Sequence, residues 1–270
     1  MPELPEVETT RRGLEPHLRG RRIVSVRVRQ PRLRWPVADG LAGQVCGQTI
    51  RALQRRGKYL LLQLETGHLI VHLGMSGSLR LTDTATFGKH DHVIFTLDDG
   101  RSLVLRDPRR FGAVLWWPGP VEDHPLLRDL GPEPLSPDFD GAWLYRRSRG
   151  SRRAVKQFLM DQHVVAGIGN IYANEALFAA GIDPRRPAGR IGRRRYDCLA
   201  AAVKAVLERA IVQGGTTLRD FVNDKGQPGY FQLALQVYGR EGQPCPRCHT
   251  PIERITLGQR ATYLCPRCQR

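Results

Sequence analysis

Four of the six cysteines form two close pairs near the C-terminus: Cys245 with Cys248, and Cys265 with Cys268. A two-residue gap lets a tight turn present both thiolates to one ion, and two such turns complete a tetrahedral site. The spacing therefore predicts one structural Zn²⁺ ion. Four thiolate ligands would leave no open position on the metal for catalysis.

A histidine follows the first pair, and the run from Cys245 to His249 formally fits a c-type haem attachment site. The acidic, proline-bearing N-terminus is the opposite of an export signal, and the matched second pair favours zinc over haem. Cys46 and Cys198 have no such neighbours in sequence. We expect them to be buried as small apolar side chains rather than to act as ligands.

The segment between the two pairs, Thr250 to Leu264, is predicted to form a β-hairpin that turns near Gly258 and Gln259. Its tip carries Arg260. A zinc-stapled hairpin could insert this rigid cation into a DNA groove. A solvated surface charge is the alternative interpretation for any single arginine.

The charge balance favours a polyanionic partner. Lys and Arg number 42 against 26 Asp and Glu, which gives a net charge of +16. A generally basic proteome would produce the same excess. No apolar stretch of about 18 residues occurs, so no membrane span is expected, and the N-terminus resembles no export signal. We expect a cytoplasmic protein, where close cysteine pairs indicate metal binding more than disulfides.

Periodic patterns predict a β-rich first part. Residues 1–131 contain short apolar or alternating runs separated by turn signals such as Asp98-Asp99-Gly100, which is typical of a β-sandwich. One helix should precede the strands, over residues 7–18. The predicted strands cover residues 23–28, 59–64, 69–73, 93–97 and 102–105.

A proline-rich passage then separates this part from a helical one. Proline stiffens the chain and cannot continue a helix or a central strand, which indicates a linker. Apolar residues at helical spacing predict helices within 151–180 and 193–213. The predicted divisions are a first domain at 1–131, a linker and start of the helical domain at 132–150, the rest of that domain at 151–240, and a zinc finger at 241–270.

Six motifs stand in a recognisable order along the chain. They are Pro2-Glu3-Leu4-Pro5-Glu6-Val7-Glu8, Gly57-Lys58-Tyr59-Leu60, His72-Leu73-Gly74-Met75-Ser76-Gly77, Asp107-Pro108-Arg109-Arg110-Phe111-Gly112, Gly167-Ile168-Gly169-Asn170-Ile171-Tyr172-Ala173-Asn174-Glu175 and the terminal cysteine pairs. With them the chain resembles the bacterial formamidopyrimidine-DNA glycosylases of the Fpg/Nei family along almost its whole length. The resemblance implies an α+β multidomain protein: an N-terminal β-sandwich with flanking helices, then a helix–two-turns–helix domain that ends in a β-hairpin zinc finger.

The resemblance also implies an activity. Such an enzyme excises 8-oxoguanine and formamidopyrimidines from damaged double-stranded DNA and then cleaves the strand as an AP lyase by β,δ-elimination. The pathway is base excision repair. The implied enzyme acts as a monomer and needs no cofactor beyond one structural zinc ion.

The catalytic residues implied by the resemblance lie at the N-terminus. Pro2, once Met1 is removed, would be the Schiff-base nucleophile. Ordinary terminal amines have a pKa of about 7.7–8.0, so part of such an amine is unprotonated near neutral pH. Glu3 would be the proton donor, and Glu6 would help to order the lesion pocket. The helix dipole alone accounts for Glu6 in a first turn but less well for Glu3, which precedes the predicted helix.

The implied phosphate contacts come from separate parts of the chain: Lys58, His72, Lys156, Asn170 and Arg260. Lys58 and Arg260 would also donate protons in the β- and δ-elimination steps. The glycines before Asn170 suit a tight turn whose backbone N–H groups can meet a phosphate. Taken alone, this pattern would indicate an ordinary corner between two helices.

A further implied group fills the void that a flipped-out nucleotide leaves. Met75, Arg109 and Phe111 match this group, and Arg110 adjoins it as a DNA contact. An aromatic wedge and a guanidinium on the orphan base can offset a flipping cost of a few kcal/mol. Residues 216–230 resemble a lesion-capping loop, whose glycines and polar residues suit a mobile lid.

Two alternatives remain open from the sequence. A sister enzyme of the same fold could act on oxidised pyrimidines, although the resemblance implies that such enzymes lack the Met75, Arg109 and Phe111 group. A non-catalytic zinc-ribbon protein could simply bind DNA. The N-terminal Pro2-Glu3 pair argues against the second alternative, because binding alone gives no reason for those residues.

Overall fold

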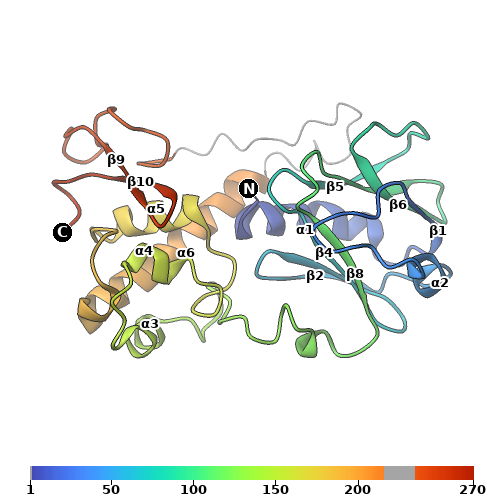
Figure 1. Ribbon diagram of the computed structural model, residues 1–270, viewed down its shortest axis with the longest axis horizontal. Coiled ribbons are helices and arrows are strands. Elements are labelled where there is room, and N and C mark those ends of the chain that lie inside the picture. The colour runs from blue at the N-terminus through green and yellow to red at the C-terminus, as the bar shows by residue number, and fades with distance from the viewer. Residues whose placement is uncertain (1, 216–234) are drawn as a thin grey trace. The chain divides into compact units, whose positions relative to one another are not determined.

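The computed structural model describes residues 2–215 and 235–270 (Figure 1). The chain divides into two compact units. Among the described residues, unit 1 comprises 2–128 and 211–215, and unit 2 comprises 129–210 and 235–270. No helix in these ranges combines the length and apolar character needed to cross a bilayer.

Unit 1 is built on two four-stranded antiparallel sheets. One has the strand order β1-β6-β7-β5 and the other the order β2-β3-β4-β8. The strands are β1 Ile23–Val28, β2 Ala52–Arg56, β3 Tyr59–Gln63, β4 His68–His72, β5 Ser78–Thr82, β6 Asp91–Leu97, β7 Ser102–Arg106 and β8 Ala113–Trp117. The helices are α1 Leu4–Leu18, α2 Leu41–Val45 and the short 3-10 helix η1 Val121–Asp123.

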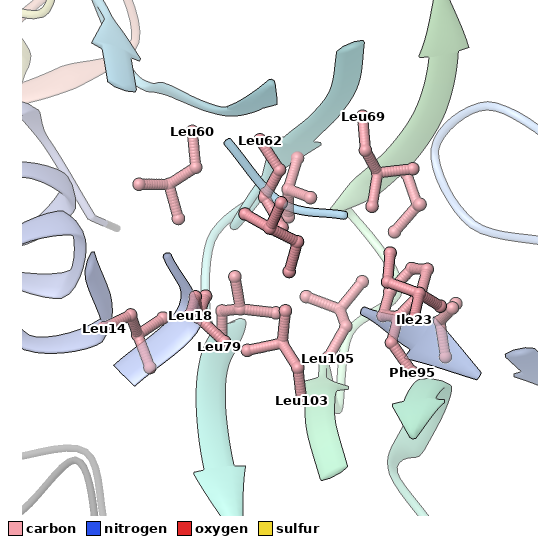
Figure 2. Packing of buried hydrophobic residues seen from close by; sticks show 14 of the residues in the cluster. Leu14, Leu18, Ile23, Leu60, Leu62, Leu69, Leu79, Phe95, Leu103 and Leu105 are labelled. Atoms are coloured by element: carbon pink, nitrogen blue, oxygen red, sulfur yellow. The ribbon is translucent and has the colours of Figure 1, made fainter. Parts of the chain in front are cut away.

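The space between the sheets is filled by side chains from both (Figure 2). Leu60 and Leu62 of β3 face this core from one sheet, and Leu79, Phe95 and Leu105 face it from the other. All five are fully buried, and each such burial contributes about 1.5–3 kcal/mol. The predicted β-sandwich is therefore confirmed.

All five predicted strands are confirmed, as β1, β3, β4, β6 and β7, with ends that differ by at most two residues. Three strands were not predicted. In β2 Leu53 is the one buried residue, so the strand carries no alternation to detect. In β5 Leu79 and Leu81 do alternate with polar residues, so the signal was present in the sequence.

The predicted start of the first helix is wrong. Helix α1 begins at Leu4 rather than residue 7, and Pro5 lies in its first turn. Proline is tolerated there because its missing N–H would have no partner within the helix. Glu3 is consequently the N-cap of α1, and a helix-capping role accounts for it as well as for Glu6.

Unit 2 combines helices with a two-stranded hairpin. Its elements are α3 Gly141–Ser148, α4 Val155–Leu159, α5 Asn170–Ala179, the 3-10 helix η2 Ala188–Arg190, α6 Arg193–Gly215 (whose last turn falls in unit 1), β9 Glu253–Leu257 and β10 Arg260–Leu264. Helix α3 starts at the N-cap Asp140, whose carboxylate accepts the Trp143 N–H at 2.6 Å. Phe158, Tyr172 and Tyr196 belong to the apolar core of this unit.

The expected burial of two cysteines is wrong, since Cys46 and Cys198 are both exposed. Cys46 caps the C-terminus of α2. Cys198 lies on α6 beside the buried stripe that Leu199 and Val203 form. A helical period of 3.6 residues turns the position before Leu199 toward solvent.

A buried carboxylate anchors the chain that leads into the zinc-finger region. Glu175 of α5 is 5% exposed. Its two oxygens accept backbone N–H groups from Gln236 at 2.9 Å, Val237 at 3.0 Å and Tyr238 at 2.9 Å. Three donors on one ionised carboxylate make strong hydrogen bonds that tie α5 to residues 236–238.

We expect Glu175→Gln to destabilise unit 2. An amide offers a single acceptor oxygen, and its NH₂ group would face a backbone N–H, which leaves a buried donor unsatisfied at a cost of about 1–3 kcal/mol. Urea unfolding of the full chain measures the effect. Glu208→Gln, at an exposed position of α6, is the matched control, and equal unfolding midpoints for the two variants would contradict the anchoring role.

Candidate active site and nucleic-acid interface

The first turn of α1 fixes the backbone beside Pro2. Leu4 and Val7 are fully buried, so the helix is held against the core from its first residue. Glu3 is 1% exposed. The Glu6 carboxylate accepts the backbone N–H of Glu3 at 2.7 Å, half of a capping box. The nitrogen of Pro2 thus lies one residue from a helix start whose position is set by burial and hydrogen bonding.

A buried ion pair ties α1 to the turn that carries Lys58. The Glu8 carboxylate is 3.1 Å from Nε of Arg55 on β2, and Arg55 also donates to the carbonyl of Gly57 at 2.9 Å. Burial alone would raise the pKa of Glu8. Hydrogen bonds from neighbouring arginines and the charge of Arg55 lower it by more than burial raises it, so the pKa lies below its ordinary value. Glu8 therefore stays ionised and holds the helix and the turn together.

Strands β3 and β4 bring Lys58 and His72 together. Tyr59, which follows Lys58, is the register partner of His72, and their rings are 4.9 Å apart. His72 is 8% exposed, and its Nδ1 accepts the Gly74 N–H at 3.0 Å. This bond places the proton of the neutral ring on Nε2. Burial, reinforced by the charges of Arg34 and Lys58, lowers the pKa of His72 to about 4.

Arg34 is a residue of this site that the sequence did not identify. Its backbone N–H donates to the Gly112 carbonyl at 3.0 Å, its guanidinium lies 4.6 Å from the Trp35 ring centroid, and its charge acts on His72. The chain contains 37 arginines, so the residue type of Arg34 does not by itself indicate a functional role. The position of Arg34 beside His72 depends on the sheet.

Two exposed loops carry the residues predicted to replace a flipped nucleotide. Met75 is 37% and Phe111 43% exposed, unusual values for large apolar side chains. The guanidinium of Arg109 lies 5.1 Å from the Phe111 ring centroid, and Arg110 adopts a positive φ of 58°. Gly74 has φ of +67°, and a Cβ there would lie 2.4 Å from the Phe111 carbonyl carbon. Glycine thus lets the two loops pack backbone to backbone.

Asp107 holds both loops in place. Its carboxylate is fully buried and accepts the Gly112 N–H at 2.6 Å, the Arg109 N–H at 3.2 Å and the Ser76 hydroxyl at 3.4 Å. Aspartate at the start of a tight turn commonly bonds the backbone two residues ahead. The sequence signal for this positioning residue was therefore present within the fourth motif.

In unit 2 the hairpin meets the start of α5 through one carbonyl. Ala261 O accepts Nδ2 of Asn170 at 3.0 Å and Nζ of Lys156 at 2.9 Å, and Lys156 also donates to the Thr262 hydroxyl at 2.6 Å. These bonds fix Arg260, the first residue of β10, next to the helix N-terminus at Asn170.

The burial of Lys156 bears on its predicted role. The side chain is 1% exposed, and its ammonium is directed at the hairpin. Lys156 therefore positions the hairpin in this structure. Its direct phosphate contact, like the catalytic and DNA-binding roles of the other site residues, stays a prediction.

The four predicted metal ligands converge. The sulfur atoms of Cys245, Cys248, Cys265 and Cys268 all lie within 4.8 Å of one another. Four sulfurs around one tetrahedral zinc, at about 2.3 Å each, need a separation of this order. Cys245 and Cys265 are buried. The donor set fits one structural Zn²⁺, which would hold the ends of the β9–β10 hairpin.

The predicted site residues fall into two sets. Unit 1 carries the N-terminal residues, Lys58, His72 and the two exposed loops, while unit 2 carries Asn170, Lys156, Arg260 and the cysteines. The lesion-capping loop predicted at 216–230 lies outside the described residues.

The chain matches three family descriptions in order. Residues 1–114 match the formamidopyrimidine-DNA glycosylase N-terminal domain, residues 130–222 the formamidopyrimidine-DNA glycosylase H2TH domain, and residues 242–270 the zinc finger found in FPG and IleRS. The last match agrees with the cluster of four sulfurs and with one structural zinc ion.

Full-length relatives and solved structures agree with these matches. The formamidopyrimidine-DNA glycosylase of Thioalkalivibrio sulfidiphilus is 58% identical over 271 residues, covering all of both chains. A Lactococcus lactis Fpg (MutM) bound to DNA containing N7-benzyl-Fapy-dG has a TM-score of 0.89 at 37% identity, covering all of both chains. A MutM in complex with DNA containing carbocyclic 8-oxo-G has a TM-score of 0.88 at 36% identity, again over all of both chains.

The low pKa of His72 predicts a pH-dependent stability. The unfolded chain binds a proton at His72 below pH 6.5, whereas the folded protein resists protonation down to about pH 4. The free energy of unfolding should therefore fall as the pH drops from 6.5 to 4, by at most about 3 kcal/mol. His72→Gln should flatten this slope in denaturant titrations across the window. Parallel slopes for the two proteins would refute the assignment.

The zinc assignment is tested by metal content. We expect about one zinc per purified chain, and loss of that zinc in Cys265→Ser, because three thiolates no longer complete a closed tetrahedral site. Cys198→Ser, at an exposed cysteine outside the cluster, is the matched control and should keep its zinc. Elemental analysis together with chelator titration gives the readout, and a Cys265→Ser protein that retains stoichiometric zinc contradicts the assignment.

Proposed function

The chain belongs to the formamidopyrimidine-DNA glycosylase family, and on this premise we propose that it excises oxidised purines from duplex DNA and then cleaves the strand at the abasic site. The relatives that carry this name support the activity. Solved neighbours bound to DNA with Fapy-dG or 8-oxo-G derivatives support the class of lesion. The biological role is base excision repair.

The observation that carries the proposal is the position of Glu3. Glu3 is 1% exposed and directly follows Pro2, at the N-cap of a helix whose apolar face is fully buried. After removal of Met1, this arrangement would keep a terminal amine and an acid on adjacent residues. General acid catalysis requires this kind of fixed proximity between proton donor and reacting group.

The glycosidic bond is broken by displacement. After removal of Met1, the lone pair of the Pro2 nitrogen forms a bond to C1′, and the bond from C1′ to the base breaks with its electron pair leaving on the base, which takes up a proton. Glu3 then protonates the ring oxygen O4′. The C1′–O4′ bond opens, and the proline nitrogen becomes a cationic iminium once its own proton has left.

Strand cleavage proceeds from the iminium. A secondary amine gives an iminium that is always cationic, so it accepts the electron pair released when C2′ loses a proton. The 3′ phosphate leaves by β-elimination, and loss of a C4′ proton then lets the 5′ phosphate leave by δ-elimination. Lys58 and Arg260 are proposed to donate protons in these two steps. Water finally releases the sugar fragment from Pro2.

The DNA contacts divide into positioning and void-filling groups. Neutral His72 can donate a hydrogen bond from Nε2 to a phosphate oxygen, and Lys58 supplies a charge beside it. Asn170 and Arg260 are proposed to hold a second stretch of backbone. Met75, Arg109 and Phe111 enter the stack in place of the flipped nucleotide, while Arg110 contacts the DNA backbone and Glu6 orders the lesion pocket.

The remaining features of the proposal are quaternary and cellular. The enzyme acts as a monomer in the cytoplasm, associated with the nucleoid through its DNA affinity. One zinc ion serves the fold of the hairpin and takes no part in the chemistry, since four thiolates leave it no open position.

Borohydride trapping tests the mechanism. The protein with a free Pro2, checked by N-terminal mass analysis, should form a covalent adduct with abasic duplex DNA after reduction. Retention of Met1 should abolish the adduct while DNA binding persists. Glu3→Gln should slow 8-oxoguanine release by roughly 100-fold or more, since a positioned acid typically contributes 10²–10⁴-fold.

Two comparisons complete this test. Arg51→Gln changes an exposed charge away from the site and should leave excision unaltered. Release of 8-oxoguanine opposite cytosine should exceed release of thymine glycol. If protein with a blocked Pro2 formed the adduct in equal yield, Pro2 would not be the nucleophile. If the protein preferred thymine glycol, oxidised purines would not be its main substrate class.

A further inference from the structure

Two segments of unit 2 carry an unusual density of arginine. Residues 146–153 contain five arginines and residues 185–195 contain six, with no acidic residue in either segment. We call these eleven side chains the arginine face: Arg146, Arg147, Arg149, Arg152, Arg153, Arg185, Arg186, Arg190, Arg193, Arg194 and Arg195. Nine are exposed, and Arg186 and Arg195 are half-buried.

The two segments lie side by side. Ala188 donates its backbone N–H to the Arg153 carbonyl at 2.8 Å, and Gly189 donates to the Ser151 carbonyl at 2.9 Å. The guanidinium of Arg149 reaches the Ile191 carbonyl at 2.9 Å. The end of α3, helix η2 and the chain that leads into α6 thus lie next to one another.

Little of this charge is compensated. Among the described residues, three of the eleven arginines pair with a carboxylate: Arg153 with Asp161, Arg185 with Asp183 and Arg193 with Asp197. The pKa of Arg195 lies below its ordinary value because of burial and then the charge of Arg186. Like charges held this close are unfavourable, so a surface that retains them favours a polyanion as its ligand.

The chemistry of the surface favours phosphate over a lipid or an apolar partner. A guanidinium group can donate two parallel N–H hydrogen bonds to two oxygens of one phosphate. Arg147 and Arg149 lie over the rings of Trp143 and Tyr145, at 5.7 and 3.9 Å from the centroids, which limits their motion. The exposed large apolar side chains of the described chain all lie elsewhere, so nothing here would insert into a bilayer or form an apolar interface core.

The α3 end of the arginine face lies away from the hairpin, whereas at the other end Arg185 is close enough to Glu253 of β9 to feel its charge, and Arg195 donates to the Arg270 carbonyl at 2.7 Å. Figure 1 places α3 on one side of unit 2 and strands β9 and β10 on the other, with α4, α5 and α6 between them. A duplex that contacts Arg260 and Asn170 would therefore leave the α3 end of the arginine face free.

We propose that the arginine face binds the phosphate backbone of a second DNA segment while the lesion-binding surface holds the first. The inference rests on the proposed function, because it assumes that the other surface binds DNA. A protein that holds two segments can pass directly from one to the other. Search for lesions would then proceed by transfer between segments as well as by sliding.

Dissociation kinetics test the proposal. The full chain is bound to a fluorescent undamaged duplex at low salt, and unlabelled duplex is added at rising concentration. Direct transfer makes the apparent dissociation rate increase with competitor concentration. The variant Arg147→Gln, Arg152→Gln, Arg190→Gln, Arg194→Gln should give a rate independent of competitor. Four lost phosphate contacts should also lower the slope of log K for the second duplex against log salt by about 4.

Matched variants separate this effect from net charge and folding. Lysine at the same four positions should retain the competitor dependence. Glutamine at four exposed arginines of unit 1, namely Arg19, Arg22, Arg27 and Arg51, removes the same charge and should retain it too. Cleavage of a short duplex with one lesion should be unchanged in every variant. If the parent protein did not cleave this duplex, the result would count against the proposed function and not against binding of a second DNA segment.

The proposal is overturned if the face variant keeps the competitor dependence or if the unit 1 variant loses it equally. It is also overturned if the parent protein shows no dependence but binds phosphatidylcholine vesicles containing phosphatidylglycerol through the same arginines. That outcome would assign the surface to an anionic membrane.

Discussion

The proposed nucleophile, the Pro2 nitrogen, must be held by the residues next to it, because a chain terminus is ordinarily the least ordered part of a protein. Here α1 does this. Leu4, Leu14 and Leu18 are fully buried along one face of the helix. The Glu8–Arg55 pair joins that helix to the turn before Lys58. The proposed chemistry depends on this anchoring, since the Pro2 nitrogen belongs to a ring that only the Pro2 backbone joins to the helix once Met1 is removed.

Around that fixed start, unit 1 uses buried polar groups to aim exposed ones. Asp107 holds the loop of Arg109 and Phe111, and Gly74 allows that loop to touch the one bearing Met75. His72 is kept neutral by burial and by the charges of Arg34 and Lys58. Charged and apolar tips can therefore face DNA while their supports stay inside the sandwich, where unsatisfied polar groups would be costly.

In unit 2, buried polar groups likewise position an exposed hairpin. Two strands alone are marginally stable, and the β9–β10 pair is fixed at its ends by the cysteine cluster and near its tip by Lys156 and Asn170 on one carbonyl. Lys156, which is expected to contact phosphate, thus also stabilises the β9–β10 hairpin that presents Arg260. The α3 end of the arginine face lies on the other side of the unit from β9 and β10, and its positive charge is proposed to serve a role distinct from that of the hairpin.

The sequence alone determined the elements and residues whose signals are local. The spacing of Cys245 and Cys248 predicted the metal site, alternation predicted β1, an apolar run predicted β6, and ordered motifs predicted the family. Tertiary structure decided what depends on contacts between distant segments: Arg34 beside His72 and the burial of Lys156. The start of α1 also escaped prediction, because Pro5 is permitted in a first turn. Residue types are fixed by sequence, but burial and charge environment arise only when separate segments pack together.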